Sequence, residues 1–398
     1  MVANLERLGA RMDELGLDGL VATTAENVFY LTGIASVSLE IFPHSGQCYA
    51  VVTRGRLAYP HFVSSRCDLD QIRDAAVDLD GALGFGTFFR EYAGEVGLSE
   101  QDDRLRRIMD HDPNPATPAD TLVATLRRAG LTTGRIAVDE DGALPGLLDT
   151  LRESLPGADF RAGADVFRHT RKVKTEAELR RLAATAAVTE RAIQAAVAIA
   201  APGATEVDLV REFERSVVGE GGRPKFSLIK FGAAAAGGQT RPTTVPLRRG
   251  EAIWFDVGIV YEGYWADLGR VFSFGPPSEK LATYYNAVLA GEDAALGAAR
   301  PGMTGKELFD VTVEAVRAAG IPHYRRNHVG HGIGVEVYDR VLITPHGDDR
   351  LEAGTVVNFE TPYYEFGFGA AMVEDPFVVR ESGNELLTTL DRRLSIID

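Results

Sequence analysis

The residues best suited to chemistry in this sequence are four carboxylates at matched positions of an internal repeat. Each copy of the repeat begins with Pro-Gly-x-Thr-x-x-x-Leu, continues to Gly-x-x-x-x-Phe followed by one acid, and ends on a second acid. An internal duplication folds into two halves about a pseudo-twofold axis, which gathers matching residues on one face. Because four buried carboxylates cannot share a face without cations, the repeat predicts a metal site. The copies begin at Pro202 and Pro301, and their acids are Asp256, Asp267, Glu360 and Glu374.

The local sequence around these acids supports a functional role. Aspartate is depleted from strand interiors, yet Asp256 lies within the apolar run 254–257. Glu360 and Glu374 likewise follow strand-like runs rich in apolar residues. A single acid of this kind equally well caps a turn or joins a surface ion pair. Four at matched positions favour one shared site.

His331 adds a nitrogen donor to this set. It lies in the segment His-Val-Gly-His-Gly-Ile-Gly, which starts at His328, and glycine on both sides lets the backbone approach a metal or substrate closely. Oxygen-rich coordination with one imidazole suits Mn²⁺, Fe²⁺, Co²⁺ or Zn²⁺ in a two-metal site, and we expect two divalent ions with manganese favoured. The predicted ligands are Asp256, Asp267, His331, Glu360 and Glu374.

Local patterns predict the elements that position these residues. Strands over 253–257 and 265–272 flank a turn at 261–263. A hairpin centred between residues 261 and 262 would place Asp256 roughly across from Asp267, with the register left open by one residue. Thr-x-x-Glu capping boxes at Thr175 and Thr304, and Ser278 as an N-cap, predict three helix starts; Gly320 closes the helix that begins after Thr304.

The N-terminal part alternates helical and strand-like patterns, which indicates an α/β unit with a mostly covered sheet. A boundary near 171–174 divides the chain into predicted domains 1–165 and 170–398. The predicted N-terminal elements are a helix over 1–16, a strand over 19–22, a hairpin of strands 48–53 and 56–60, a surface loop over 110–115, a helix over 122–129 and a strand over 136–138.

Composition narrows the class of protein. The 398-residue chain carries a net charge of −15, which argues against nucleic acid or an anionic membrane as the main partner. Its two cysteines, Cys48 and Cys67, provide neither a disulfide framework nor a thiolate metal cluster. The N-terminal segment lacks a signal-peptide core, and the most apolar stretch, 192–201, is too short to span a bilayer. We expect a cytoplasmic enzyme.

Five short motifs surround the predicted ligands: Asp256-Val-Gly, Asp267-Leu-Gly-Arg270, Gly330-His331-Gly-Ile-Gly, Phe359-Glu360-x-Pro362 and Val373-Glu374-Asp375. They resemble the ligand motifs of the pita-bread metallohydrolases, a superfamily that includes creatinase, prolidase, aminopeptidase P and methionine aminopeptidase. Tyr30-Leu-Thr-Gly33 is similar to the creatinase/prolidase N-terminal domain, and the segment 171–178 to the usual entry into the catalytic domain. The resemblance therefore covers nearly the whole chain.

The resemblance implies a fold and roles. It implies an α/β N-terminal domain, an α+β pita-bread C-terminal domain with a pseudo-twofold repeat, and a homodimer. Asp256 and Asp267 would hold one metal ion, Asp267 and Glu374 would bridge, and His331 with Glu360 would complete the second. Glu360 would accept a proton from the nucleophilic water. His328 matches a histidine often found three residues before the ligand, and a catalytic or a structural role remains open for it.

The chain departs from the family pattern at three positions that hold the substrate. No histidine lies near 239–240, Tyr338 stands where a second histidine is expected, and Met372 stands where an arginine is usual. The changes remove donors to a tetrahedral oxyanion and a bidentate carboxylate anchor. The interpretation is that the metal site is retained and the substrate contacts are rebuilt.

Nearby residues are the predicted replacements. Tyr338 is a predicted catalytic hydrogen-bond or proton donor, and Arg241 and Arg340 are predicted anion anchors; the alternative is that each is an ordinary surface group. Asp339 and Met372 complete the predicted substrate-binding set.

The resulting hypothesis is a dinuclear-metal hydrolase of C–N bonds, similar to Xaa-Pro peptidases, acting on a small or short peptide-like substrate that is not the usual one. One alternative is a lyase on the same scaffold, with Glu360 or Asp339 as the base. A second is a non-catalytic binding protein, which retention of all five ligand types disfavours.

Overall fold

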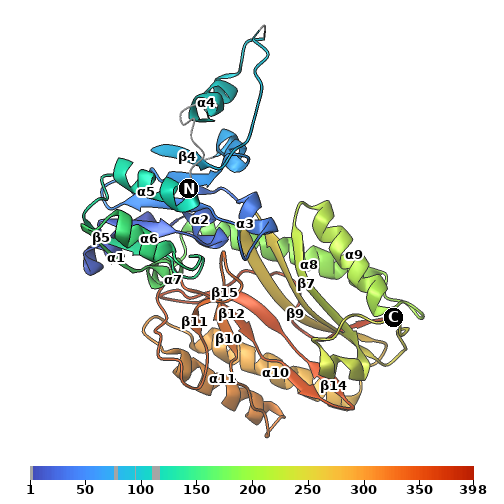
Figure 1. The fold of residues 1–398 in the computed structure, drawn as a ribbon. Coiled ribbons are helices and arrows are strands. Elements are labelled where there is room, and N and C mark those ends of the chain that lie inside the picture. The colour runs from blue at the N-terminus through green and yellow to red at the C-terminus, as the bar shows by residue number, and fades with distance from the viewer. Residues whose placement is uncertain (1–2, 76–78, 95, 110–116) are drawn as a thin grey trace. The chain divides into compact units, whose positions relative to one another are not determined.

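The computed structural model describes residues 3–75, 79–94, 96–109 and 117–398, so the predicted loop at 110–115 lies outside the described residues. The chain divides into two compact units, Met1–Arg171 and Lys172–Asp398. Both are coloured along the chain in Figure 1. Among the described residues, no helix combines the length and apolar composition that a membrane crossing requires.

The first unit is a mixed sheet covered by helices, as predicted. Its described strands follow the order β4-β3-β2-β1-β5-β6, in which β1, β2 and β3 pair antiparallel and the other pairs are parallel. Its apolar core joins Val21 and Ile136 of the sheet to Leu122 and Leu126. The strands are β1 Gly19–Ala22, β2 Tyr49–Thr53, β3 His61–Ser65, β4 Gly81–Phe85, β5 Gly134–Val138 and β6 Ala158–Ala162. The helices are α1 Leu5–Leu15, α2 Ala25–Thr32, α3 Val37–Ile41, the 3₁₀ helix η1 Asp68–Asp74, α4 Glu100–Met109, α5 Pro118–Arg128, α6 Leu147–Ser154 and α7 Ala164–Arg171.

The second strand of the predicted N-terminal hairpin lies later than expected. The prediction of a strand over 56–60 is wrong, because these residues form turns: the Arg56 N–H donates to the Thr53 carbonyl and the Tyr59 N–H to the Arg56 carbonyl. Pro60 has no N–H to offer a ladder. The strand therefore begins at His61.

The second unit is a curved sheet that carries two helix pairs. The sheet follows the order β11-β10-β12-β15-β9-β8-β7, with β16 beside β15 and β17 beside β9. In Figure 1, α8 and α9 lie beside β7, and α10 and α11 lie beside the opposite half of the sheet. The helices are α8 Glu176–Ala198, α9 Glu206–Gly219, the 3₁₀ helix η2 Gly232–Gly237, α10 Glu279–Ala298 and α11 Gly305–Ala319. The strands are β7 Arg223–Phe231, β8 Ala252–Tyr261, β9 Tyr264–Phe274, β10 Gly330–Gly332, β11 Asp339–Leu342, β12 Val356–Glu360, β13 Tyr363–Glu365, β14 Gly369–Ala371, β15 Glu374–Val378, β16 Glu385–Leu386 and β17 Ser395–Ile397.

The predicted internal repeat is visible in matched backbone details. Thr205 caps α9 and Thr304 caps α11, each in a reciprocal capping box with the acid three residues later. Gly250 and Gly354 have φ angles of 93° and 86°, a conformation that glycine adopts without steric cost. Their N–H groups donate to the carbonyls of Phe274 and Val379. The two halves of the unit are therefore built on the same local plan.

The hairpin of β8 and β9 sets the positions of the first two acids. Its two-residue turn, 262–263, has positive φ at both positions, 49° and 82°, as a type I′ turn requires. Asp256 consequently pairs with Gly269, and Asp267 with Gly258. The turn is centred one residue later than predicted, so Asp256 and Asp267 lie roughly across from each other, as predicted, but are not direct ladder partners. The register changes by two positions, so both aspartates still share one face.

Candidate metal centre

Three strands bring together Asp267 of β9, His331 of β10 and Glu374 of β15. One potential ligand atom from each residue lies within 4.8 Å of the others, and all three side chains are buried. Gly269, the ladder partner of Glu374, keeps this space open. A Cβ atom at residue 269 would lie 2.9 Å from the Cβ of Glu374 and 2.6 Å from the Cε of Met372.

The cluster presents buried polar atoms that lack partners. Asp267 Oδ1, His331 Nε2 and Glu374 Oε2 have no hydrogen bond among the described residues. His331 Nδ1 lies 3.0 Å from the Gly332 carbonyl and donates to it, which leaves the lone pair on Nε2. Buried polar atoms without partners are costly. Two carboxylate oxygens and one imidazole nitrogen form a donor set that fits a divalent cation.

Asn358 orients one of these carboxylates. Its Nδ2 donates to Glu374 Oε1 over 2.7 Å, and the side chain is fully buried. Such a bond fixes which oxygen of Glu374 faces the cluster. The sequence interpretation missed this residue, although a buried amide inside the apolar run 356–359 was an available signal.

Burial and mutual repulsion shift the pKa values of the four acids. Burial raises the pKa of Asp256 to about 7, and the charge of Glu360 adds to the rise. Burial also raises the pKa of Asp267 and that of Glu374 well above their ordinary values, and repulsion among the acids adds to both. Glu360 differs: burial raises its pKa, but the hydrogen bond from His328 and the charge of Arg326 lower it overall.

Glu360, His328 and Tyr338, the predicted catalytic residues, form one chain of contacts. His328 Nε2 lies 2.6 Å from Glu360 Oε1, and Tyr338 Oη lies 3.2 Å from the same nitrogen. The Tyr338 ring stacks on His331, with centroids 3.8 Å apart and planes inclined by 14°. Burial and the charge of Glu360 raise the pKa of Tyr338, so its hydroxyl keeps the proton.

The four predicted substrate-binding residues lie in surroundings that differ from one residue to the next. Arg340 binds the Asp349 carboxylate through Nε and Nη2, and the Arg241 side chain is exposed. Asp339 is buried with Oδ2 3.9 Å from the Lys174 ammonium. Met372 is buried in the apolar cluster that contains Trp254 and Tyr285.

Arg326 was missed by the sequence interpretation. Its Nη2 donates to Glu360 Oε2 over 3.0 Å, and its side chain is only 16% exposed. The signal was a basic pair, Arg325-Arg326, just before His328. Such basic pairs more often lie on a solvated surface. The partner of Arg326, Glu360, lies 34 positions later in the sequence, so the pair of arginines alone does not reveal the contact.

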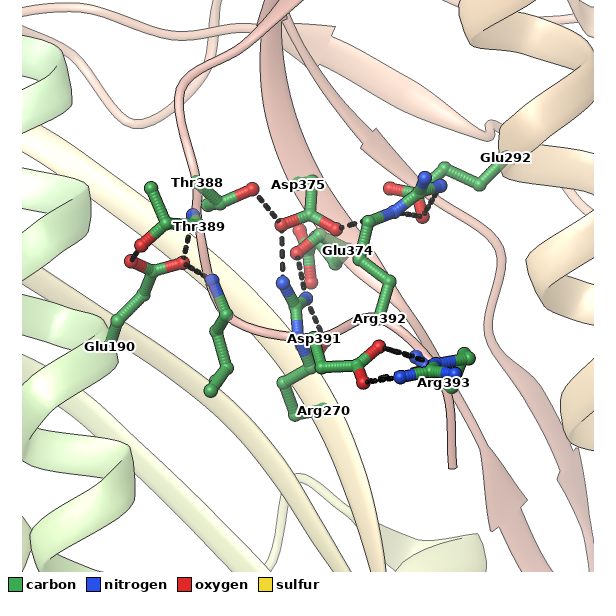
Figure 2. A network of polar contacts seen from close by, with 12 residues as sticks. Glu190, Arg270, Glu292, Glu374, Asp375, Thr388, Thr389, Asp391, Arg392 and Arg393 are labelled. Carbon is green, nitrogen blue, oxygen red and sulfur yellow. Dashed lines mark hydrogen bonds and ion pairs between the residues drawn. The ribbon is translucent and has the colours of Figure 1, made fainter. Parts of the chain in front are cut away.

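A network of charged side chains lies behind β9 and β15 (Figure 2). Asp375 follows Glu374 in β15 and therefore points to the opposite face of the sheet. It accepts hydrogen bonds from Arg270 Nη2 and Thr388 Oγ1, both at 2.5 Å, and lies 3.3 Å from Arg392 Nε. Arg270 also donates to the Glu374 carbonyl. The network joins β9, β15 and the C-terminal segment.

One helix from each half of the unit contributes to this network. Glu190 of α8 accepts the N–H groups of Thr389 and Leu390, and Glu292 of α10 binds Arg392. Figure 2 shows Glu190 and Glu292 on either side of the segment that carries Arg392. The C-terminal segment is thus held between the two halves, directly behind the strands that bear Asp267 and Glu374.

We predict that Arg270→Met lowers the free energy of unfolding by about 3 kcal/mol, because it leaves the buried Asp375 carboxylate without its closest cation. The double variant Arg270→Met/Asp375→Leu should recover most of that loss, since no uncompensated acid remains. Urea denaturation of both variants measures the difference. A double variant as unstable as the single one would contradict this account of the network.

We predict that the metal-free protein loses stability as the pH rises from about 4 to about 8. In this window the folded state binds more protons than the unfolded state, because the pKa values of Asp256, Asp267 and Glu374 are raised on folding. Glu360, whose pKa is lowered, opposes the other three acids but does not outweigh them. Urea denaturation across this range, with chelator and with Mn²⁺, measures the slopes. Equal slopes would contradict a shared cation site.

Comparison with known proteins agrees with this geometry. Residues 180–381 match metallopeptidase family M24, and residues 4–173 match the creatinase/prolidase N-terminal domain. A putative dipeptidase, YkvY of Bacillus subtilis, is 24% identical over 396 residues, which cover 99% of both chains. An Xaa-Pro dipeptidase of Lactobacillus delbrueckii subsp. lactis is 29% identical over 66% of this chain and 72% of the relative.

Solved structures share the fold over almost the entire chain. A dipeptidase from Pyrococcus horikoshii OT3 superposes with a TM-score of 0.77 at 22% identity, covering 99% of both chains. An Xaa-Pro dipeptidase from Bacillus anthracis gives the same TM-score and coverage at 21% identity. These structures confirm the predicted two-domain fold, and the match to metallopeptidase family M24 confirms the predicted enzyme class. The chain belongs to metallopeptidase family M24 and is a metal-dependent enzyme with a creatinase/prolidase N-terminal domain and a pita-bread catalytic domain.

Proposed function

We propose that the protein hydrolyses the C–N bond of a small, peptide-like substrate with the help of two divalent ions, manganese being favoured. The observation that carries the proposal is the group of unpartnered buried atoms on Asp267, His331 and Glu374. Relatives described as dipeptidases support peptide-like substrates. The proposed ligands are Asp256, Asp267, His331, Glu360 and Glu374.

The metal ions would supply an activated water and polarise the scissile carbonyl. The residues of the chain do the rest. Glu360 accepts the proton of the nucleophile, with His328 Nε2 holding its Oε1 in place. Tyr338 provides a hydroxyl donor where the family pattern has a histidine, and its stacking on His331 fixes the ring.

The substrate is proposed to be a small amide, amidine or modified amino acid rather than a general peptide. Tyr338 and Met372 stand where the family pattern has a histidine and an arginine. Met372 packs among apolar side chains and offers no charge to a substrate carboxylate. The proposal also places the enzyme in the cytoplasm, as the sequence composition predicts, and makes it a homodimer, which the family resemblance implies.

Turnover in ¹⁸O-water tests the reaction class. Protein loaded with Mn²⁺ should cleave small amides, amidines or modified amino acids in a panel that also contains Xaa-Pro dipeptides and tripeptides, with ¹⁸O entering the product at the carbon of the cleaved C–N bond. A product without the label would contradict hydrolysis and favour the lyase alternative. Metal-loaded protein that cleaves nothing in the panel would contradict the proposed substrate class.

Tyr338→Phe should lower turnover at least tenfold, about 1.4 kcal/mol of barrier, and leave the metal content unchanged. The variant keeps the ring that stacks on His331 and removes only the donor hydroxyl. Tyr363→Phe is the matched control, because the Tyr363 hydroxyl binds Glu365. Unchanged turnover in Tyr338→Phe would remove this residue from the catalytic set.

A further inference from the structure

Arg326 offers hydrogen-bond donors beside the proposed catalytic residues. A guanidinium carries five N–H groups, two on each Nη and one on Nε. Nη2 donates to Glu360 Oε2 over 3.0 Å, and Nε donates to the His328 carbonyl over 3.3 Å. Nη1 is accessible and makes no hydrogen bond with any residue that the structure describes. The guanidinium therefore keeps N–H groups with which it can bind a small molecule.

Arg326 and Tyr338 approach Glu360 from its two different oxygens. His328 Nε2 lies 2.6 Å from Glu360 Oε1, and the Tyr338 hydroxyl lies 3.2 Å from the same histidine nitrogen. Arg326 contacts Oε2 instead, with its guanidinium carbon 6.0 Å from the centre of the Tyr364 ring. A substrate whose scissile bond lies near Glu360 and Tyr338 therefore has a guanidinium within reach on its other side.

The charge of Arg326 suits an anionic group. A guanidinium stays protonated throughout the physiological pH range. The Arg326 side chain is only 16% exposed, so water screens its charge weakly. The two proposed divalent ions would balance the charge of the four proposed carboxylate ligands, which leaves the guanidinium as an uncompensated positive charge at the edge of the site. A substrate with a negative charge at this position would balance it.

Two other arginines of the catalytic unit are bound to carboxylates elsewhere. Arg340, a predicted anion anchor, binds Asp349 through Nε and Nη2. Arg270 binds Asp375 behind the sheet. Arg326 differs from both in contacting a residue proposed to take part in the reaction.

We propose that Arg326 binds a carboxylate of the substrate, and that the protein acts on small amides that carry this carboxylate close to the scissile C–N bond. Nη1 and the second N–H of Nη2 can bind the two carboxylate oxygens side by side, as guanidinium groups favour. Arg326 thereby supplies the cation that Met372 does not, from the segment before β10 and not from the end of β14. This inference rests on the proposed hydrolytic function.

Paired substrates with and without the carboxylate test the proposal. Each amide is assayed with Mn²⁺-loaded protein as the free acid and as its primary carboxamide, for example N-acetylglycine with N-acetylglycinamide and glycylproline with glycylprolinamide, by following cleavage of the internal amide. Wild type should favour the acids about tenfold or more in kcat/KM, and Arg326→Met should abolish this preference by raising KM for the acids. The ratio within each pair is the readout, because damage to Glu360 or to the fold lowers both members.

Two further variants sharpen the assay. Arg326→Lys keeps the charge without the planar fork and should retain part of the preference. Arg325→Met is the matched control, because this neighbouring arginine is exposed, and it should leave the ratio unchanged. Arg326→Gln removes the charge and keeps a polar side chain, so it replaces the methionine variant if that variant fails to fold.

The outcomes separate this inference from the function on which it rests. Wild type that cleaves carboxamides as well as acids, or a preference for acids that survives both Arg326→Met and Arg326→Gln, would overturn the role of Arg326 and leave hydrolysis standing. Protein that cleaves neither acids nor carboxamides would overturn the proposed function itself.

Discussion

Repulsion among buried carboxylates is the constraint on which the catalytic unit depends. Asp256, Asp267, Glu360 and Glu374 face one another in a site where burial already disfavours charge. The chain compensates only in part. Asn358 bonds one oxygen of Glu374, while Arg326 and His328 bond Glu360. Asp267 Oδ1, His331 Nε2 and Glu374 Oε2 are left without a hydrogen bond from any described residue. This imbalance is what a metal-binding site requires, because ions complete it.

A rigid frame makes such an arrangement tolerable. The repeat gives each half its own capped helix and its own apolar core, and the shared sheet carries the acids between them. On the opposite face, Arg270 ties β9 to β15 through Asp375, and the C-terminal segment adds Arg392. Paired charges behind the sheet thus hold the strands that carry the proposed metal ligands. Stability lost at the proposed ligands is offset by packing and by this network.

Much of the fold was predictable because its signals are local or repeated. The capping boxes at Thr175 and Thr304 depend on residues three apart, and the repeat aligns the acids without knowledge of the fold. The hairpin register was not predictable, because it depends on Glu262 adopting a positive φ, which its residue type does not favour. Arg326 and Asn358 were missed for a different reason. Their roles come from contacts with acids 34 and 16 residues away, and only the folded chain reveals those partners.

Anomalous diffraction from crystals equilibrated with Mn²⁺ tests the central claim most directly. The account predicts a strong manganese peak within coordination distance of Asp267, His331 and Glu374, whose unpartnered atoms would become its ligands. Absence of a peak at this position, in crystals where manganese is bound elsewhere on the protein, would contradict the claim that the buried acids are held together by a metal ion.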